Sequence, residues 1–154
     1  MTLAERLVVR LRERGETLGV AESLTGGLLA ASVVEVAGAS AVFRGGIVAY
    51  ATELKASLVG VPAGLLAERG PVDPDVAAAL AEGARDRCGA TWGLGTTGVA
   101  GPTPQGGHEV GVVYLGLCGP GGGRVRSLRL TGSRSEIRVA SVTAALDLLY
   151  SALT

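Results

Sequence analysis

Short apolar segments alternate with helical patterns along the whole chain, and most of the helices begin or end at a recognisable signal. A capping box of Thr2 and Glu5 opens the first helix, which ends at Gly15, and a second box of Ser133 and Glu136 opens the last helix. The pattern predicts helices over 3–14, 28–36, 52–59, 74–87 and 134–151, and strands over 17–21, 41–50, 91–96, 110–117 and 124–130. This alternation predicts an α/β fold, a three-layer α/β/α sandwich with a mixed central sheet, because the last two strands resemble a hairpin.

The chain shows no internal division. No charge run, Pro/Ser linker or repeat interrupts its 154 residues, so we expect one domain over 1–154. Aromatic residues make up only 3%, which leaves Val, Leu, Ala and Ile to form the core. The 25 glycines have no collagen period and indicate turns, caps and close backbone approaches. The Gly45-Gly46 pair within a predicted strand suggests a bulge or a close approach.

Charge and hydropathy exclude several classes of protein. Fourteen basic residues balance fourteen acidic ones, which argues against a nucleic-acid partner. No apolar run reaches the ~18 residues of a membrane span, and no signal-peptide pattern is present, so we expect no membrane partner and a cytoplasmic location. Cys88 and Cys118 stand alone in the sequence, and we expect two buried, reduced thiols.

The segment 21–27 (AESLTGG) places Ser23 after an apolar strand and just before a helix. Ligands of α/β folds bind at such loops. The main-chain amides of 24–27 can hold an oxyanion, because a helix N-terminus offers free donors and a positive partial charge. Gly26 and Gly27 allow a close backbone approach. Taken alone, the pattern also fits an ordinary capping Ser23 or Thr25 before a glycine-rich turn.

A nucleophilic serine needs a base, and the chain offers few. The single histidine, His108, lies in a glycine-rich loop and is expected to be solvated, while arginine stays protonated. Lys55 is the only lysine, since the other thirteen basic residues are arginines, although a high-GC genome also favours arginine. Lys55 follows Tyr50 at the end of a predicted strand, in the first turn of a helix.

The pKa of a free lysine, about 10.4, is too high for a base at neutral pH. Burial and the positive end of a helix both lower it, and a drop of three units corresponds to roughly 4 kcal/mol. A neutral Lys55 can take the proton from Ser23 and return it to an amine leaving group. The Tyr50 phenol either relays the proton or orients the reacting groups in this step, or it is a strand-end side chain that only packs.

A second loop, 95–102 (GTTGVAGP), also follows a strand. Its amides and hydroxyls, around Thr97, Gly98 and Gly101, have the character of an anion cradle, although the signal is weak by itself. Arg138, near the start of the last helix, either makes a bidentate phosphate contact or is a solvated helix residue.

These segments together resemble the CinA C-terminal family, known as nicotinamide-nucleotide amidohydrolase (PncC, or NMN deamidase). The resemblance covers about residues 3–150 and rests on AESLTGG at 21–27, GGIVAY at 45–50 with Lys55, GPV at 70–72, TGVAGP at 97–102 and EIR at 136–138. It implies hydrolysis of the carboxamide of nicotinamide mononucleotide to nicotinate mononucleotide and ammonia. It also implies a three-layer fold, a small-molecule nucleotide substrate, no metal, no cofactor and a homo-oligomer.

The resemblance assigns roles to particular residues. It makes Ser23 the nucleophile and Lys55 the general base and then acid, with Tyr50 as the family's tyrosine. The loop of Thr25, Gly26 and Gly27 would hold the oxyanion, and the substrate phosphate would be held by Thr97, Gly98, Gly101 and Arg138.

The sequence also departs from the family pattern. Leu24 replaces a frequent cysteine, the loop 103–109 lacks the lysine of many members, and the N-terminal domain of full-length CinA proteins is missing. A capping box directly after Met1 favours an intact short protein. Two alternatives stay open: a hydrolase of another small amide, and a non-catalytic nucleotide-binding or regulatory module. In that module Lys55 would be charged, exposed and beyond reach of Ser23.

Overall fold

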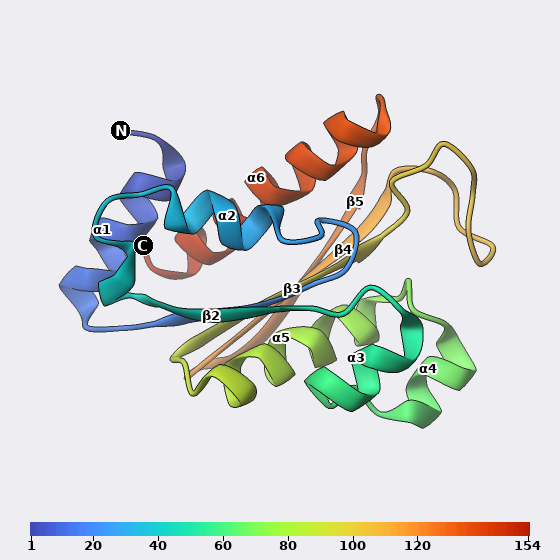
Figure 1. The fold of residues 1–154 in the computed structure, drawn as a ribbon, viewed down its shortest axis with the longest axis horizontal. Helices are drawn as coiled ribbons and strands as arrows, with labels where there is room; N and C mark the ends of the chain where they lie inside the picture. The colour runs from blue at the N-terminus through green and yellow to red at the C-terminus, as the bar shows by residue number, and fades with distance from the viewer.

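A five-stranded sheet in the order β2-β1-β3-β4-β5 forms the middle layer of the computed structural model, which describes residues 1–154 (Figure 1). β1 pairs in parallel with β2 and β3, whereas β3 with β4 and β4 with β5 are antiparallel. The strands are β1 (Leu18–Glu22), β2 (Phe43–Val48), β3 (Trp92–Gly98), β4 (Val112–Gly119) and β5 (Gly122–Arg129). The predicted mixed sheet is therefore confirmed.

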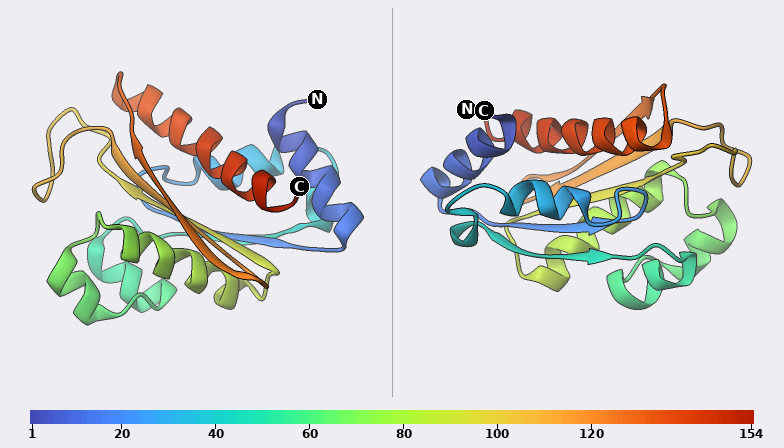
Figure 2. Two further views of the ribbon diagram at one scale, coloured as in Figure 1. Left: turned by 180° about the vertical axis from the view of Figure 1, so that it is seen from behind. Right: turned by 45° about the horizontal axis from the view of Figure 1, so that its top comes forward.

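Helices cover both faces of this sheet, as Figure 2 shows from two further sides. One layer holds α1 (Leu3–Arg14), α2 (Leu28–Val34) and α6 (Arg134–Ala152). The other holds α3 (Thr52–Val59), α4 (Ala63–Arg69) and α5 (Pro74–Cys88), with α5 lying along β1, β3 and β4. The arrangement is the predicted α/β/α sandwich.

Aliphatic side chains fill the space between the layers, as the low aromatic content requires. All five residues of β1 are buried, because helices lie on both of its faces. The larger core cluster lies under α1, α2 and α6 and includes Leu7, Leu94 and Leu149, while a smaller one under α3, α4 and α5 includes Val59 and Leu80. Each fully buried Leu or Val contributes about 1.5–3 kcal/mol.

Glycines let α5 approach the centre of the sheet closely. A Cβ added to Gly95 of β3 would lie 2.7 Å from the Cβ of Leu80 on α5, and Gly93 and Gly116 face the α5 backbone in the same way. Any side chain at these positions would push α5 off the sheet. This tight packing fixes the position of the C-terminal end of β3 beside that of β1.

The structure refines the predicted elements in three places. The expected strand 41–50 is shorter, because residues 39–41 form a 3-10 turn and β2 ends at Val48. The expected bulge lies next to the glycine pair: Leu18 pairs with Phe43 and Gly19 with Gly45, so Arg44 of β2 is skipped. The helix α4 was not predicted.

Two further expectations concern the cysteines and the membrane. Cys88 and Cys118 are free thiols, as expected, but each is partly rather than fully buried. None of the helices combines the length and the apolar character that crossing a bilayer requires.

Candidate active site

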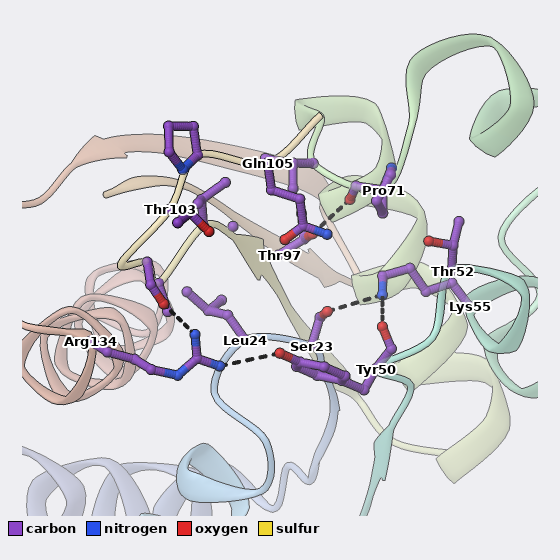
Figure 3. A pocket seen from close by; sticks show the side chains of 16 residues that line it. Ser23, Leu24, Tyr50, Thr52, Lys55, Pro71, Thr97, Thr103, Gln105 and Arg134 are labelled. Carbon is purple, nitrogen blue, oxygen red and sulfur yellow. Dashed lines mark hydrogen bonds between the residues drawn. The ribbon is translucent and has the colours of Figure 1, made fainter. Parts of the chain in front are cut away.

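A cavity opens where the loops after β1, β2 and β3 meet the N-terminal end of α6 (Figure 3). Parallel strands bring their carboxyl ends to one edge of the sheet, and this is where α/β folds place ligand sites. The lining contains two cationic side chains and no carboxylate. It consists of Ser23, Leu24, Tyr50, Thr52, Lys55, Pro71, Val72, 97–101, 103–105 and Arg134.

Ser23 and Lys55 meet at the floor of this cavity. The Nζ of Lys55 lies 3.0 Å from the Oγ of Ser23. Lys55 is only 1% exposed and Ser23 only 8%, so both polar groups are largely withdrawn from bulk water. β1 positions the serine, and the first turns of α3 position the lysine.

Two main-chain carbonyls fix the orientation of the lysine. Nζ lies 2.8 Å from the carbonyl oxygen of Ala49 and 3.1 Å from that of Tyr50. A carbonyl oxygen can only accept, so a neutral amine donates its two N–H groups to this pair. Its lone pair is then directed at the remaining neighbour, the Ser23 hydroxyl, which donates to it. The neutral form of Lys55 is thus oriented as a base toward Ser23.

The electrostatic surroundings favour that neutral form. Burial lowers the pKa of Lys55 from its ordinary 10.5 to about 8, against a smaller opposing effect of the Glu53 carboxylate. Lys55 forms no ion pair that would restore the charge. Roughly a tenth of the lysine is therefore neutral at pH 7, and about half at pH 8.

The helix that follows Ser23 begins at the residue that the sequence predicts. α2 starts at Leu28, and its first free amides, those of Leu29 and Ala30, donate at 2.8 and 3.0 Å to the buried carboxylate of Glu22. Glu22 therefore takes the anion position at this helix N-terminus. The helix amides themselves are therefore occupied, and the expected oxyanion donors, the amides of 24–27, lie in the turn before the helix.

Free donors remain in the turn between Ser23 and α2. The amide of Gly26 donates to the Ser23 carbonyl, and that of Leu28 donates to the Thr25 carbonyl. The amides of Leu24, Thr25 and Gly27 donate to no protein acceptor. Gly26 and Gly27 have φ values of 55° and 101°, a left-handed backbone that glycine adopts without strain. The turn thus leaves main-chain donors directly after the serine.

Arg138 supports this turn from outside the cavity. Its Nε donates to the Leu24 carbonyl at 2.9 Å and its Nη2 to the Thr25 carbonyl at 3.1 Å. The Thr25 hydroxyl is fully buried and bonds to that of Thr96 at 2.8 Å. Thr25, Gly26, Gly27 and Arg138, all expected to touch substrate, therefore do not line the cavity. The side chains of Thr25 and Arg138 bond within the protein instead.

Arg134, one helical turn before Arg138, lies at the cavity mouth instead. Its Nη2 donates to the Tyr50 hydroxyl at 3.2 Å, and its Nη1 donates to the Gly101 carbonyl. The guanidinium has no carboxylate partner. Sequence reasoning missed Arg134, although its place at the first position of a capped helix was a usable signal.

The other predicted residues do reach the cavity. Thr97, Gly98 and Gly101 line it, and the Thr97 hydroxyl donates to the Pro71 carbonyl at 2.6 Å. Tyr50 lines it too and is 62% exposed, and its phenol hydroxyl bonds to Arg134 and makes no hydrogen bond to Ser23 or Lys55. Tyr50 meets Lys55 only through its carbonyl, so the phenol relay considered for it is not seen.

Comparison with known proteins places the chain in a family. The model of the CinA C-terminal domain matches residues 1–153. The chain belongs to the CinA C-terminal domain family. A CinA-like protein of Frankia casuarinae is 58% identical over 139 residues, which cover 90% of this chain and 32% of that protein. A CinA-like protein of Anaeromyxobacter sp. is 52% identical over 150 residues, 96% of this chain and 36% of that protein. The chain spans about a third of these curated relatives.

Solved structures of CinA proteins share the fold. The competence/damage inducible protein CihA from Agrobacterium tumefaciens matches with a TM-score of 0.93 at 35% identity, over 97% of this chain and 92% of that one. A CinA superfamily protein from Klebsiella pneumoniae matches with a TM-score of 0.94 at 29% identity, over 98% and 95%. The family name carries no reaction, so any activity has to be argued from the cavity.

Proposed function

We propose that this CinA-family chain hydrolyses the carboxamide of nicotinamide mononucleotide, giving nicotinate mononucleotide and ammonia, with Ser23 and Lys55 as a nucleophile–base pair. The observation that carries the proposal is the buried Ser23–Lys55 contact of 3.0 Å, with two carbonyls orienting the lysine. A hydroxyl beside a base of lowered pKa is the arrangement that nucleophilic amide hydrolysis requires. The pyridine mononucleotide as substrate comes from the resemblance to the amidohydrolases of the family.

In the first half-reaction, the Ser23 oxygen bonds to the carboxamide carbon while its proton passes to Nζ of Lys55. The carbonyl oxygen becomes an oxyanion, and the free amide of Leu24, which lines the cavity, supplies a donor for it. Lys55, now an ammonium, gives its proton to the amide nitrogen, the C–N bond breaks and ammonia leaves. An ester between Ser23 and the pyridine carbonyl remains.

The second half-reaction repeats these steps with water. Neutral Lys55 takes a proton from a water molecule whose oxygen bonds to the ester carbon. Collapse of the second tetrahedral intermediate breaks the bond to the Ser23 oxygen, which recovers the proton from Lys55. The product acid releases its remaining proton to the ammonia formed or to water, which gives the carboxylate of nicotinate mononucleotide, and both side chains return to their starting states.

The substrate phosphate is assigned to the Arg134 side of the cavity. Arg134 is the only guanidinium in the lining, it has no carboxylate partner, and a phosphate can accept from both of its terminal nitrogens. Thr97, Gly98 and Gly101 line the same cavity. A phosphate held away from the reacting amide positions that amide against Ser23, which lowers the barrier by several kcal/mol in favourable cases.

A non-catalytic nucleotide-binding module would have a charged and exposed Lys55 away from Ser23. The burial of Lys55 and its contact with the hydroxyl favour the enzyme. A hydrolase of another small amide fits the Ser23–Lys55 pair equally well, and the uncompensated charge of Arg134 favours an anionic substrate over a neutral one.

The direct test is incubation of the purified chain with nicotinamide mononucleotide and measurement of ammonia, beside the Ser23→Ala variant. We expect ammonia from the wild type and none from Ser23→Ala, which should still bind the nucleotide within several-fold because its hydroxyl is not needed for binding. Equal ammonia release by both proteins, or none by either, would reject the proposed reaction.

A further inference from the structure

The loop between β3 and β4 forms a small hairpin that projects beyond the end of the sheet (Figure 1). Gln105 and His108 pair across it through two main-chain hydrogen bonds of 3.0 and 2.9 Å. Between them Gly106 and Gly107 have φ values of 57° and 81°, the two positive angles that a two-residue type I′ turn requires. The backbone of Gln105 is therefore held by regular hairpin geometry.

The base of this hairpin is also fixed. The His108 ring packs edge-on against Tyr114 of β4, with centroids 6.5 Å apart. Gly101 closes the base against Val110, where a Cβ would come within 2.6 Å of the valine side chain, and its carbonyl accepts from Arg134. These contacts make the hairpin a defined wall of the cavity.

Gln105 presents a polar side chain on this wall, on the side of the Ser23–Lys55 pair. It lines the same cavity, and Figure 3 shows its carboxamide directed toward Ser23 and Thr97. The carboxamide of Gln105 makes no hydrogen bond within the protein, whereas the hydroxyl of Thr97 is already bonded to the Pro71 carbonyl. Its donor and its acceptor are both available to a ligand.

We propose that Gln105 is a specificity-determining residue that recognises the primary carboxamide of the substrate, an inference that rests on the proposed amide hydrolysis. A primary amide bound with its carbon at Ser23 carries N–H groups on the leaving nitrogen. The Gln105 Oε1 accepts one of them, which turns the nitrogen lone pair toward Lys55, the group that must protonate it. An ester has no N–H at this position, so it cannot donate to the Gln105 Oε1.

The test compares two substrates that differ only in the group that leaves the carbonyl carbon: nicotinamide mononucleotide, which is an amide, and the methyl ester of nicotinate mononucleotide. Ammonia and methanol release give kcat/KM for wild type, Gln105→Leu and the control Thr103→Val, which alters another cavity residue on the same arm of the hairpin. We expect Gln105→Leu to lower kcat/KM for the amide about tenfold, the value of one lost hydrogen bond, and to change that for the ester less than twofold. Thr103→Val should change the amide-to-ester ratio less than twofold.

The outcomes separate this inference from the proposed function. Suppose that the wild type hydrolyses the amide, but Gln105→Leu lowers kcat/KM equally for both substrates or for neither. The recognition role is then wrong, while the proposed reaction stands. A similar change of ratio in Thr103→Val would also overturn it, because the effect would belong to the hairpin as a whole. If the wild type hydrolyses neither substrate, the reaction and the inference fail together.

Discussion

The Nζ of Lys55 and the Oγ of Ser23 lie 3.0 Å apart, although 32 positions separate the two residues in the sequence. The parallel pairing of β1 with β2 produces this contact, because the chain leaves both strands at the same edge of the sheet. The carbonyls of Ala49 and Tyr50, in the connection from β2 to α3, complete the arrangement by holding the lysine nitrogen. A base and a nucleophile are thus assembled by sheet topology.

Replacement of the lysine by another cation tests whether Lys55 has to accept a proton. Lys55→Arg keeps the positive charge but cannot act as a base, because a guanidinium stays protonated. We expect ammonia release from nicotinamide mononucleotide to fall at least a hundredfold, the usual contribution of a general base. Appreciable turnover by Lys55→Arg, in a protein that circular dichroism shows to be folded, would exclude the proposed base.

The rate should follow the titration of Lys55. Only the neutral amine accepts the serine proton, and burial lowers the pKa of Lys55 to about 8. We therefore expect kcat/KM to rise about tenfold per pH unit below that pKa and to level off above it. A profile measured between pH 6 and 9.5 checks this, and a flat profile across pH 7 to 8 would show that the reaction does not depend on this group.

The same pKa shift has a signature in stability. The pKa of Lys55 is about 8 in the folded chain and near the ordinary 10.5 when unfolded, so the unfolded state binds more protons between these values. The free energy of unfolding should then rise with pH across this window, by roughly 3 kcal/mol in total from this group. Denaturant titrations of wild type and Lys55→Met isolate the effect, because the variant lacks this titration. Parallel curves for the two proteins would contradict the shift.

Two arginines on α6 should affect different kinetic constants. Arg134→Gln removes the cation at the cavity mouth, so we expect KM for nicotinamide mononucleotide to rise roughly ten- to a hundredfold, which is more than kcat falls. Arg138→Gln removes the support of the Leu24 and Thr25 carbonyls, so kcat should fall more than KM rises. Steady-state measurements of kcat and KM for both variants check this prediction. If KM rises mainly in Arg138→Gln and kcat falls mainly in Arg134→Gln, the phosphate contact belongs to Arg138.

Local sequence patterns predicted the secondary structure well. Both capping boxes are formed, Asp73 caps α5 by accepting from the Asp75 amide, and the skipped residue in β2 lies next to the glycine pair. These features depend on residues close together in the chain, so a sequence shows them directly. The helix α4, which has no side-chain cap at its start, gave no comparable signal and was missed.

Apolar periodicity and unusual composition need no coordinates, and they were enough to predict the fold class and to single out Ser23 and the only lysine. Which groups enter the cavity depends on how the elements pack. Arg134 and Arg138 lie four residues apart on α6, about 6 Å along the axis, so the docking of that helix on the sheet selects between them. Likewise, Glu22 occupies the start of α2 because strand, turn and helix fold back on one another. Such choices depend on distances between elements, which no local pattern contains.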